Sequence, residues 1–197
     1  RPAGPGAIPV AAWLLACLPA LRAAQSPAGG LPTQLSDEEF WRLSADLSEP
    51  GGTFSSDNLV SNERDLPNFA AALRSRVAPG GAYLGVGPEQ NFTYIAAVRP
   101  RIAFVIDIRR ANLHLHLLYK ALFELSADRA DFVSRLLIKK RPGGFTRTIT
   151  AKQLMESFWD VFTGDETTFR ASLADVFDVL TRRHGFPLSD DDRAGIE

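Results

Sequence analysis

Two glycines and one acidic residue in the middle of the chain have the types and the spacing of a site for an adenosine-like ligand. Gly85 and Gly87 follow a short apolar run, and Asp107 ends a second apolar run twenty positions after Gly87. Glycine lets a backbone turn sharply and come close to a ligand. An acid at this offset accepts hydrogen bonds from the two hydroxyls of a ribose. The pattern therefore predicts a ribose-binding site.

One helix and two strands are expected to position these residues. Residues 82–84 form the first apolar run, and residues 102–106 form the second. Residues 89–98 between them are predicted to be helical, because Pro100 cannot continue a helix. A helix is the usual crossover between two parallel strands. We therefore expect a parallel strand–helix–strand unit with a glycine turn at residues 85–87, although these glycines could also serve only to make the turn.

The residues at the start of this helix favour one class of ligand. The third glycine of a dinucleotide motif would fall at Gln90, and Glu89 stands where a pyrophosphate would bind. A carboxylate there repels phosphate and suits a ligand with a cationic or amine end. The sequence therefore favours S-adenosylmethionine as the cofactor over NAD or FAD.

Several other polar residues are candidates for the same site. Arg109 and Arg110 follow the second strand, at the edge where open α/β sheets bind ligands. They would hold a carboxylate of the ligand or substrate, or be solvated, or pair with nearby acids. The polar stretch of residues 53–63 is expected to fold over the site, with Asn58 and Asn62 as candidates, or to form ordinary turns. The predicted cofactor-binding residues are Gly85, Gly87, Glu89, Asn91, Asp107 and Arg109.

Helical patterns account for most of the remaining chain. Ser36 and Thr150 begin capping boxes, and residues 112–125 are apolar almost all round, which is typical of a buried helix. His114 and His116 are two positions apart, so they face different sides of that helix and do not form a zinc pair. The other expected helices are residues 67–77, a helix from Ser126 to about residue 137, residues 150–162, residues 166–183, and a last one that begins at Ser189.

Composition limits the class of protein. The chain has 197 residues, a net charge of -1 and one cysteine, Cys17. This charge gives no general attraction to nucleic acid, and a lone cysteine excludes an internal disulfide. We expect a small-molecule ligand, no nucleic-acid partner, no metal, and no membrane-spanning helix, because no apolar run has the required length.

The chain is expected to have three parts. Residues 1–35 are a leader in which the apolar residues 7–21 have the length of a signal-peptide core. Export to the periplasm or medium is then expected, with possible acylation of Cys17; a disordered leader would leave the protein cytoplasmic. Residues 36–110 hold the first helices and the βαβ unit, and residues 111–197 form a helical insertion or cap. A two-stranded sheet is small for an independent unit, so we expect a longer parent protein.

Residues 53–63, 85–97 and 105–109 together resemble an uncharacterised bacterial family related to class I S-adenosylmethionine-dependent methyltransferases. The resemblance extends over about residues 36–197. It implies an α/β, mostly helical chain with a partial Rossmann-like methyltransferase fold and a large helical insertion. By this resemblance Gly85 and Gly87 match the nucleotide-loop glycines and Asp107 the ribose-binding acid. The chain lacks the acid that such enzymes usually carry near position 83, and it shows no known catalytic motif.

The predicted function is therefore that of a methyltransferase-like protein that binds S-adenosylmethionine, with an unknown acceptor. The alternative is a non-catalytic exported protein that uses the same fold to bind a ligand or partner. A nicotinamide-dependent oxidoreductase is disfavoured by Glu89 and by the missing third glycine.

Overall fold

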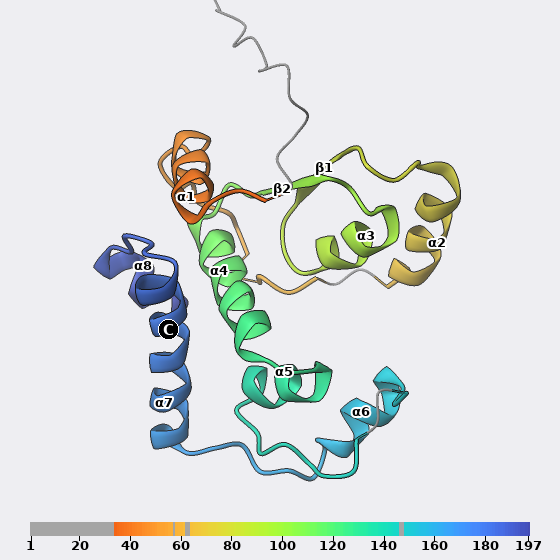
Figure 1. Ribbon diagram of the computed structural model, residues 1–197, viewed down its shortest axis with the longest axis vertical. Helices are drawn as coiled ribbons and strands as arrows, with labels where there is room; N and C mark the ends of the chain where they lie inside the picture. The colour runs from red at the N-terminus through yellow and green to blue at the C-terminus, as the bar shows by residue number, and fades with distance from the viewer. Residues whose placement is uncertain (1–33, 57, 62–63, 146–147) are drawn as a thin grey trace, which may run out of the picture. The chain divides into compact units, whose positions relative to one another are not determined.

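The computed structural model describes residues 34–56, 58–61, 64–145 and 148–197, and it shows a largely helical α/β chain with a two-stranded parallel sheet (Figure 1). The predictions for the leader, Cys17 and Asn62 lie outside these residues. Among the residues that the structure describes, no helix combines the length and the apolar character needed to cross a bilayer.

The predicted strand–helix–strand unit is confirmed. Strand β1 (Ala82–Val86) pairs in parallel with β2 (Ile102–Ile106), in a register that runs from Ala82 opposite Ile102 to Val86 opposite Ile106. Helix α3 (Gln90–Val98) makes the crossover. The predicted turn at residues 85–87 is wrong in extent, because Gly85 and Val86 still pair with β2. The turn begins at Gly87, which has a φ of 84°.

The two faces of the sheet differ. Tyr83 and Gly85 lie under α3, where the Tyr83 hydroxyl bonds to a side chain of that helix. On the opposite face Leu84, Val86 and Ile106 are 72%, 66% and 56% exposed. The described part of the chain therefore leaves one face of the sheet apolar and exposed to solvent.

The main hydrophobic core is helical. It is built by α4 (Arg110–Leu125), α7 (Glu166–Phe177), the π-helical turn η2 (Asp178–Arg183) and α8 (Asp190–Ile196). The predicted helix 166–183 is confirmed, although its last six residues are π-helical. Helix α4 is buried on one side only, since Phe123 is half exposed. The buried residues of this core are Leu117, Ala121, Leu122, Val176, Val179, Leu180, Phe186 and Ile196.

A smaller core joins α5 (Arg129–Leu136) to α6 (Ala151–Ser157) through Ala130, Leu154 and Phe158. Two predictions were wrong here. Helix α5 is capped by Asp128, because Ser126 instead donates to the Leu122 carbonyl at the end of α4. Helix α6 ends at Ser157 and does not reach residue 162, which leaves Trp159 and Phe162 largely exposed.

The first two helices pack against different parts. Helix α1 (Asp37–Asp46) begins with the predicted Ser36 capping box, and its aromatic residues contact Phe186 of the main core. His184 adds a polar link, since its two ring nitrogens lie 2.7 Å from carboxylate oxygens of Asp37 and Glu124. Helix α2 (Leu66–Arg76) packs against α3.

Candidate functional site

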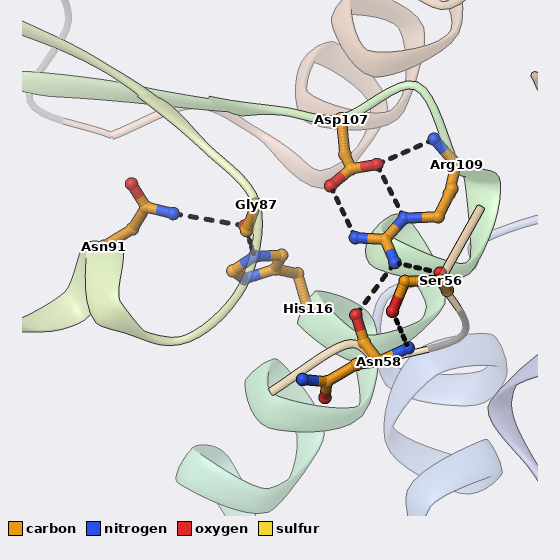
Figure 2. Close-up of polar contacts among 7 residues, drawn as sticks. All are labelled: Ser56, Asn58, Gly87, Asn91, Asp107, Arg109 and His116. Atoms are coloured by element: carbon orange, nitrogen blue, oxygen red, sulfur yellow. Dashed lines mark hydrogen bonds and ion pairs between the residues drawn. The ribbon is translucent and has the colours of Figure 1, made fainter. Parts of the chain in front are cut away.

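The structure brings the predicted glycine and acid together at the carboxyl edge of the sheet (Figure 2). Gly87 follows β1 and Asp107 follows β2. A Cβ atom added to Gly87 would lie 3.9 Å from Oδ2 of Asp107, and the positive φ of Gly87 disfavours any other residue. A close approach of backbone and carboxylate therefore exists where the sequence predicts a ribose.

Asp107 is held by Arg109. Its Oδ1 accepts hydrogen bonds from the backbone nitrogen of Arg109 at 2.8 Å and from Nε at 3.0 Å, and its Oδ2 accepts one from Nη2 at 3.1 Å. The side-chain bonds from Arg109 are the main reason why the pKa of Asp107 lies below its ordinary value. A carboxylate accepts about four hydrogen bonds. Among the described residues Oδ2 accepts only from Nη2 of Arg109, so it can accept one more hydrogen bond.

Arg109 also fastens the N-terminal loop, by which we mean residues 52–56 and 58–61. Its Nη1 donates to the carbonyl oxygens of Ser56 at 3.1 Å and Asn58 at 2.9 Å, and its guanidinium lies over the ring of Phe54. The loop is also joined to the segment that follows β2, because the Gly52 nitrogen donates to the Ile108 carbonyl at 2.9 Å. The polar stretch therefore lies at the predicted edge, and Arg109 connects it to Asp107.

Glu89 anchors the other end of this loop. Both of its carboxylate oxygens accept from the backbone nitrogen of Ser61, at 2.9 Å and 3.2 Å. Glu89 precedes α3 as its N-cap residue but makes no side-chain cap bond to the helix. Its negative charge thus stands beside the turn after β1, as the sequence predicts, and one of its partners is the loop itself.

Asn91 and Gly85 support the turn that follows β1. The Asn91 side chain is 1% exposed; its Nδ2 donates to the carbonyl oxygens of Val86, Gly87 and Pro88, and its Oδ1 accepts from the Tyr83 hydroxyl at 2.7 Å. A Cβ on Gly85 would overlap the Asn91 amide. Internal packing therefore accounts for both residues, because the Asn91 amide is engaged by Tyr83 and by the carbonyls of the turn.

His116 is a part of the site that the sequence did not single out. Its Nε2 lies 3.2 Å from the Gly87 carbonyl oxygen, and its ring meets Phe92 of α3 edge to face. The only sequence signal was the spacing from His114, which correctly separated the two side chains. His116 thereby joins α4 to the turn after β1.

An open cavity of about 300 Å³ lies between the N-terminal loop and the start of α3. Gln90 lines this cavity. Its Nε2 donates to the Val86 carbonyl at 3.1 Å, and its Oε1 is buried without a hydrogen-bond partner among the described residues. The cavity is lined by Phe54, Ser56, Asn58, Val60, Ser61, Pro88 and Gln90, all of them neutral.

Arg110 does not contact Asp107 and instead pairs with Asp192 of α8. It donates to Oδ1 of the buried Asp192 at 2.8 Å, and His114 Nε2 lies 2.8 Å from the same oxygen. Burial alone would raise the pKa of Asp192, but the hydrogen bonds from Arg110, His114 and Ser189 outweigh it and hold this pKa well below the ordinary value. These contacts fix α8 to α4. In the described parts of the chain no cluster of metal-ligating side chains occurs.

The chain is a mixed α/β protein that carries polar side chains at the carboxyl edge of its parallel strand pair. The chain belongs to a family described as a domain of unknown function (DUF7790), which matches residues 58–179. That match spans the whole strand–helix–strand unit and the helices from α4 to α7. No curated protein and no solved structure matches the chain.

Proposed function

We propose that this protein is methyltransferase-like and binds S-adenosylmethionine at the carboxyl edge of β1 and β2, in a partial Rossmann-like arrangement. The observation that carries the proposal is the approach of Gly87 to Asp107 across the ends of two parallel strands. Such an edge is where open α/β sheets bind nucleotides.

The residues around Gly87 fit this ligand in two respects. Oδ2 of Asp107 can accept a hydrogen bond from a ribose hydroxyl, and the absence of a side chain at Gly87 keeps the backbone close to that carboxylate. The carboxylate of Glu89 disfavours a pyrophosphate at the same turn, which supports a nucleoside without phosphate. When bound, S-adenosylmethionine would supply an activated methyl group, and the contribution of the chain would be to hold and orient it.

Arg109 favours a second candidate function. It occupies most of the hydrogen-bonding capacity of Asp107 and joins that acid to the N-terminal loop. When Arg109 occupies most of the hydrogen-bonding positions of the Asp107 carboxylate, the edge also suits a non-catalytic protein. Such a protein would bind another ligand or a partner there. The two functions differ in whether a ribose ligand competes for Asp107.

Calorimetric titration separates the two candidates. S-adenosylmethionine and S-adenosylhomocysteine should bind the wild-type chain in the micromolar range, with NAD as a comparison that should not bind. Asp107→Ala should weaken binding about 10- to 100-fold, as expected for the loss of a hydrogen bond to a charged group. Asp160→Ala, which removes an exposed acid, is the matched control and should bind normally. Unchanged affinity in a folded Asp107→Ala variant would support the non-catalytic alternative.

A further inference from the structure

We propose that the protein docks on an anionic lipid bilayer through two exposed rings and two lysines next to α6. These four residues, Lys139, Lys140, Trp159 and Phe162, are called the α6 surface below. Trp159 is 85% exposed and Phe162 is 92% exposed, more than any other large hydrophobic residue of the described chain. The α6 surface lies outside the strand–helix–strand unit, so the inference does not rest on the proposed ligand.

The fold fixes the backbone that carries the two rings. Phe158 is 1% exposed and belongs to the smaller core between α5 and α6, so the residue before Trp159 is anchored. The two ends of the segment are also joined, because Lys139 pairs with Thr163 in an antiparallel bridge. The rings are therefore exposed on a segment that is held at its ends and in its middle.

The same contacts place the two lysines beside the rings. The Lys139 ammonium donates to the Phe158 carbonyl oxygen at 3.0 Å, one residue before Trp159. The bridge between residues 139 and 163 is antiparallel, so Lys140 comes at the position opposite Phe162. A lysine ammonium has three donors, which leaves two on Lys139. Lys140 is exposed and has no acidic partner among the described residues.

The charge of this part of the chain is complementary to an anionic surface. Residues 138–145 and 148–163 contain four basic and two acidic residues, whereas the whole chain has a net charge of -1. Of the two acids, Glu156 pairs with Lys152, and Asp160 is exposed between the two rings in the sequence. Anionic lipids attract lysines near the membrane surface. Asp160 opposes this attraction, so its removal should strengthen binding.

A bilayer fits the α6 surface better than a nucleic acid does. Proteins that bind single strands use several cations along a groove that follows the phosphates, whereas here two lysines flank the rings and an acid separates them. Tryptophan is enriched where membrane proteins meet the lipid headgroups. Apolar side chains that enter this interface and lysines that face anionic lipids contribute to the same binding.

The first test is co-sedimentation of the full chain with lipid vesicles. The chain should bind mixed phosphatidylcholine and phosphatidylglycerol vesicles at least about 5-fold more tightly than pure phosphatidylcholine vesicles. Replacing both Trp159 and Phe162 by serine should weaken binding at least about 10-fold, because two apolar side chains no longer enter the interface. The matched control replaces Leu47 and Phe69, which are also exposed, by serine and should bind as the wild type does.

Single charge changes test the role of the lipid charge. Lys140→Ala should weaken binding to the mixed vesicles about 5-fold and leave binding to the neutral vesicles unchanged. Asp160→Asn should change binding to the mixed vesicles in the opposite direction. Added salt should weaken binding to the mixed vesicles, since it screens exposed charges. A surface that binds only through its rings would respond to none of these changes, and this result would overturn the proposal.

Fluorescence locates the contact on the chain. Trp13→Phe and Trp41→Phe together leave Trp159 as the only one of the three tryptophans. Its emission should move to shorter wavelength when mixed vesicles are added, because its ring leaves water. Binding through another part of the chain, including residues 1–35, would leave this emission unchanged and would overturn the proposal. This readout does not require the double serine variant to fold.

The remaining outcomes also decide the proposal. It is overturned if the wild type binds no vesicles, or if a correctly folded double serine variant binds them equally well. It is also overturned if the double variant abolishes only self-association, measured by analytical ultracentrifugation, or only binding to a single-stranded oligonucleotide. None of these results concerns binding of S-adenosylmethionine at the strand edge, which calorimetry tests separately. Circular dichroism checks the fold of each variant.

Discussion

The strand–helix–strand unit and the helical part that follows it are stabilised in different ways. From α4 to α8 the buried side chains are mostly apolar, and Leu117, Val179 and Leu180 have almost no exposed surface. In the unit from β1 to β2 the most deeply buried side chain is the amide of Asn91. Its sheet meanwhile leaves Leu84 and Val86 exposed. Apolar burial thus supports the helices, and polar contacts shape the site.

This difference explains how the chain can shape the candidate site without burying it. Hydrogen bonds have strict geometry, so the Asn91 contacts set the path of the Gly87 turn. The free energy of apolar packing scales with the buried area and does not depend on direction. The helical core therefore raises the free energy of unfolding but does not fix the geometry of the candidate site. The following experiments test that division.

The largest expected effect is from a cavity in the helical core. Leu180→Ala should lower the free energy of unfolding by about 2–5 kcal/mol, because the side chain is fully buried. Urea denaturation followed by circular dichroism measures the change.

Leu84→Ala in the sheet is the matched control, with the same atoms removed from a side chain that is 72% exposed. Its effect should stay within about 0.5 kcal/mol. A loss comparable to that of Leu180→Ala would mean that the sheet face is covered in solution, and the comparison between the two parts would fail.

The second effect concerns the ionic contact inside the helical part. Asp192→Ala should cost about 1.5–3 kcal/mol, since it removes the carboxylate that the buried His114 and the half-exposed Arg110 share. Urea denaturation at neutral pH measures it. Asp190→Ala, an exposed acid in the same first turn, should cost much less.

The same carboxylate makes stability depend on pH. The pKa of Asp192 is lower in the folded state than in the unfolded chain, where it is about 3.9. Its stabilisation is therefore present above that value and is lost as the pH falls toward the lower folded value. Unfolding curves between pH 6 and pH 2.5 should show this decline, and Asp192→Asn should show less of it. An equal decline in the variant would assign the effect to other acids, such as Asp107.

A third experiment tests the polar contacts in the strand–helix–strand unit. Asn91→Ala should cost about 1–3 kcal/mol, because the Tyr83 hydroxyl and the turn carbonyls lose a buried partner. Hydrogen exchange should accelerate for amides of β1 and β2 and stay unchanged in α7. Asn68→Ala, an exposed asparagine on α2, is the control. Faster exchange throughout the chain would show that the two parts unfold together.

The smallest effect is expected where aromatic side chains are exposed within the helical part. Replacing both Trp159 and Phe162 by serine should change the free energy of unfolding by no more than about 0.5 kcal/mol, since both are largely exposed. The neighbouring buried Phe158 gives the contrast, with a cost of about 3–5 kcal/mol for Phe158→Ala. Thermal unfolding compares the two variants. A large effect of the double variant would point to a contact of these rings in solution.

The sequence predicted the positions of helices and strands along the chain better than it predicted the contacts between them. Capping residues such as Ser36, Thr150 and Ser189 act within one turn, so their helices could be placed from spacing alone. Helix α6 was made too long because Trp159 and Phe162 fit a helical period, although the structure leaves them exposed. The last residues of β1 were assigned to a turn because glycine was expected to break the strand, whereas Gly85 is required beneath Asn91.

The site was predicted as a set of positions, and the partners of those positions were not. The proximity of Gly87 to Asp107 followed from a strand–helix–strand pattern. The pairing of Arg109 with Asp107 is local, and it was considered only as one alternative. Contacts over long separations, such as Glu89 with Ser61 and Arg110 with Asp192, left no signal in the spacing of residues. The buried Oε1 of Gln90 depends on the path of the backbone, so sequence could not reveal it.

The π-helical turn η2 determines the direction in which the residues after it face. A π-turn holds one residue more than an α-turn, and one residue corresponds to about 100° of rotation in an α-helix. If residues 178–183 were wound as an α-helix with none of them deleted, His184 would be rotated by about that angle. His184 would then leave Asp37 and Glu124, and Phe186 would leave the rings of α1. The wider π-turn, which accommodates one extra residue, thus determines the direction in which the end of this helix meets α1.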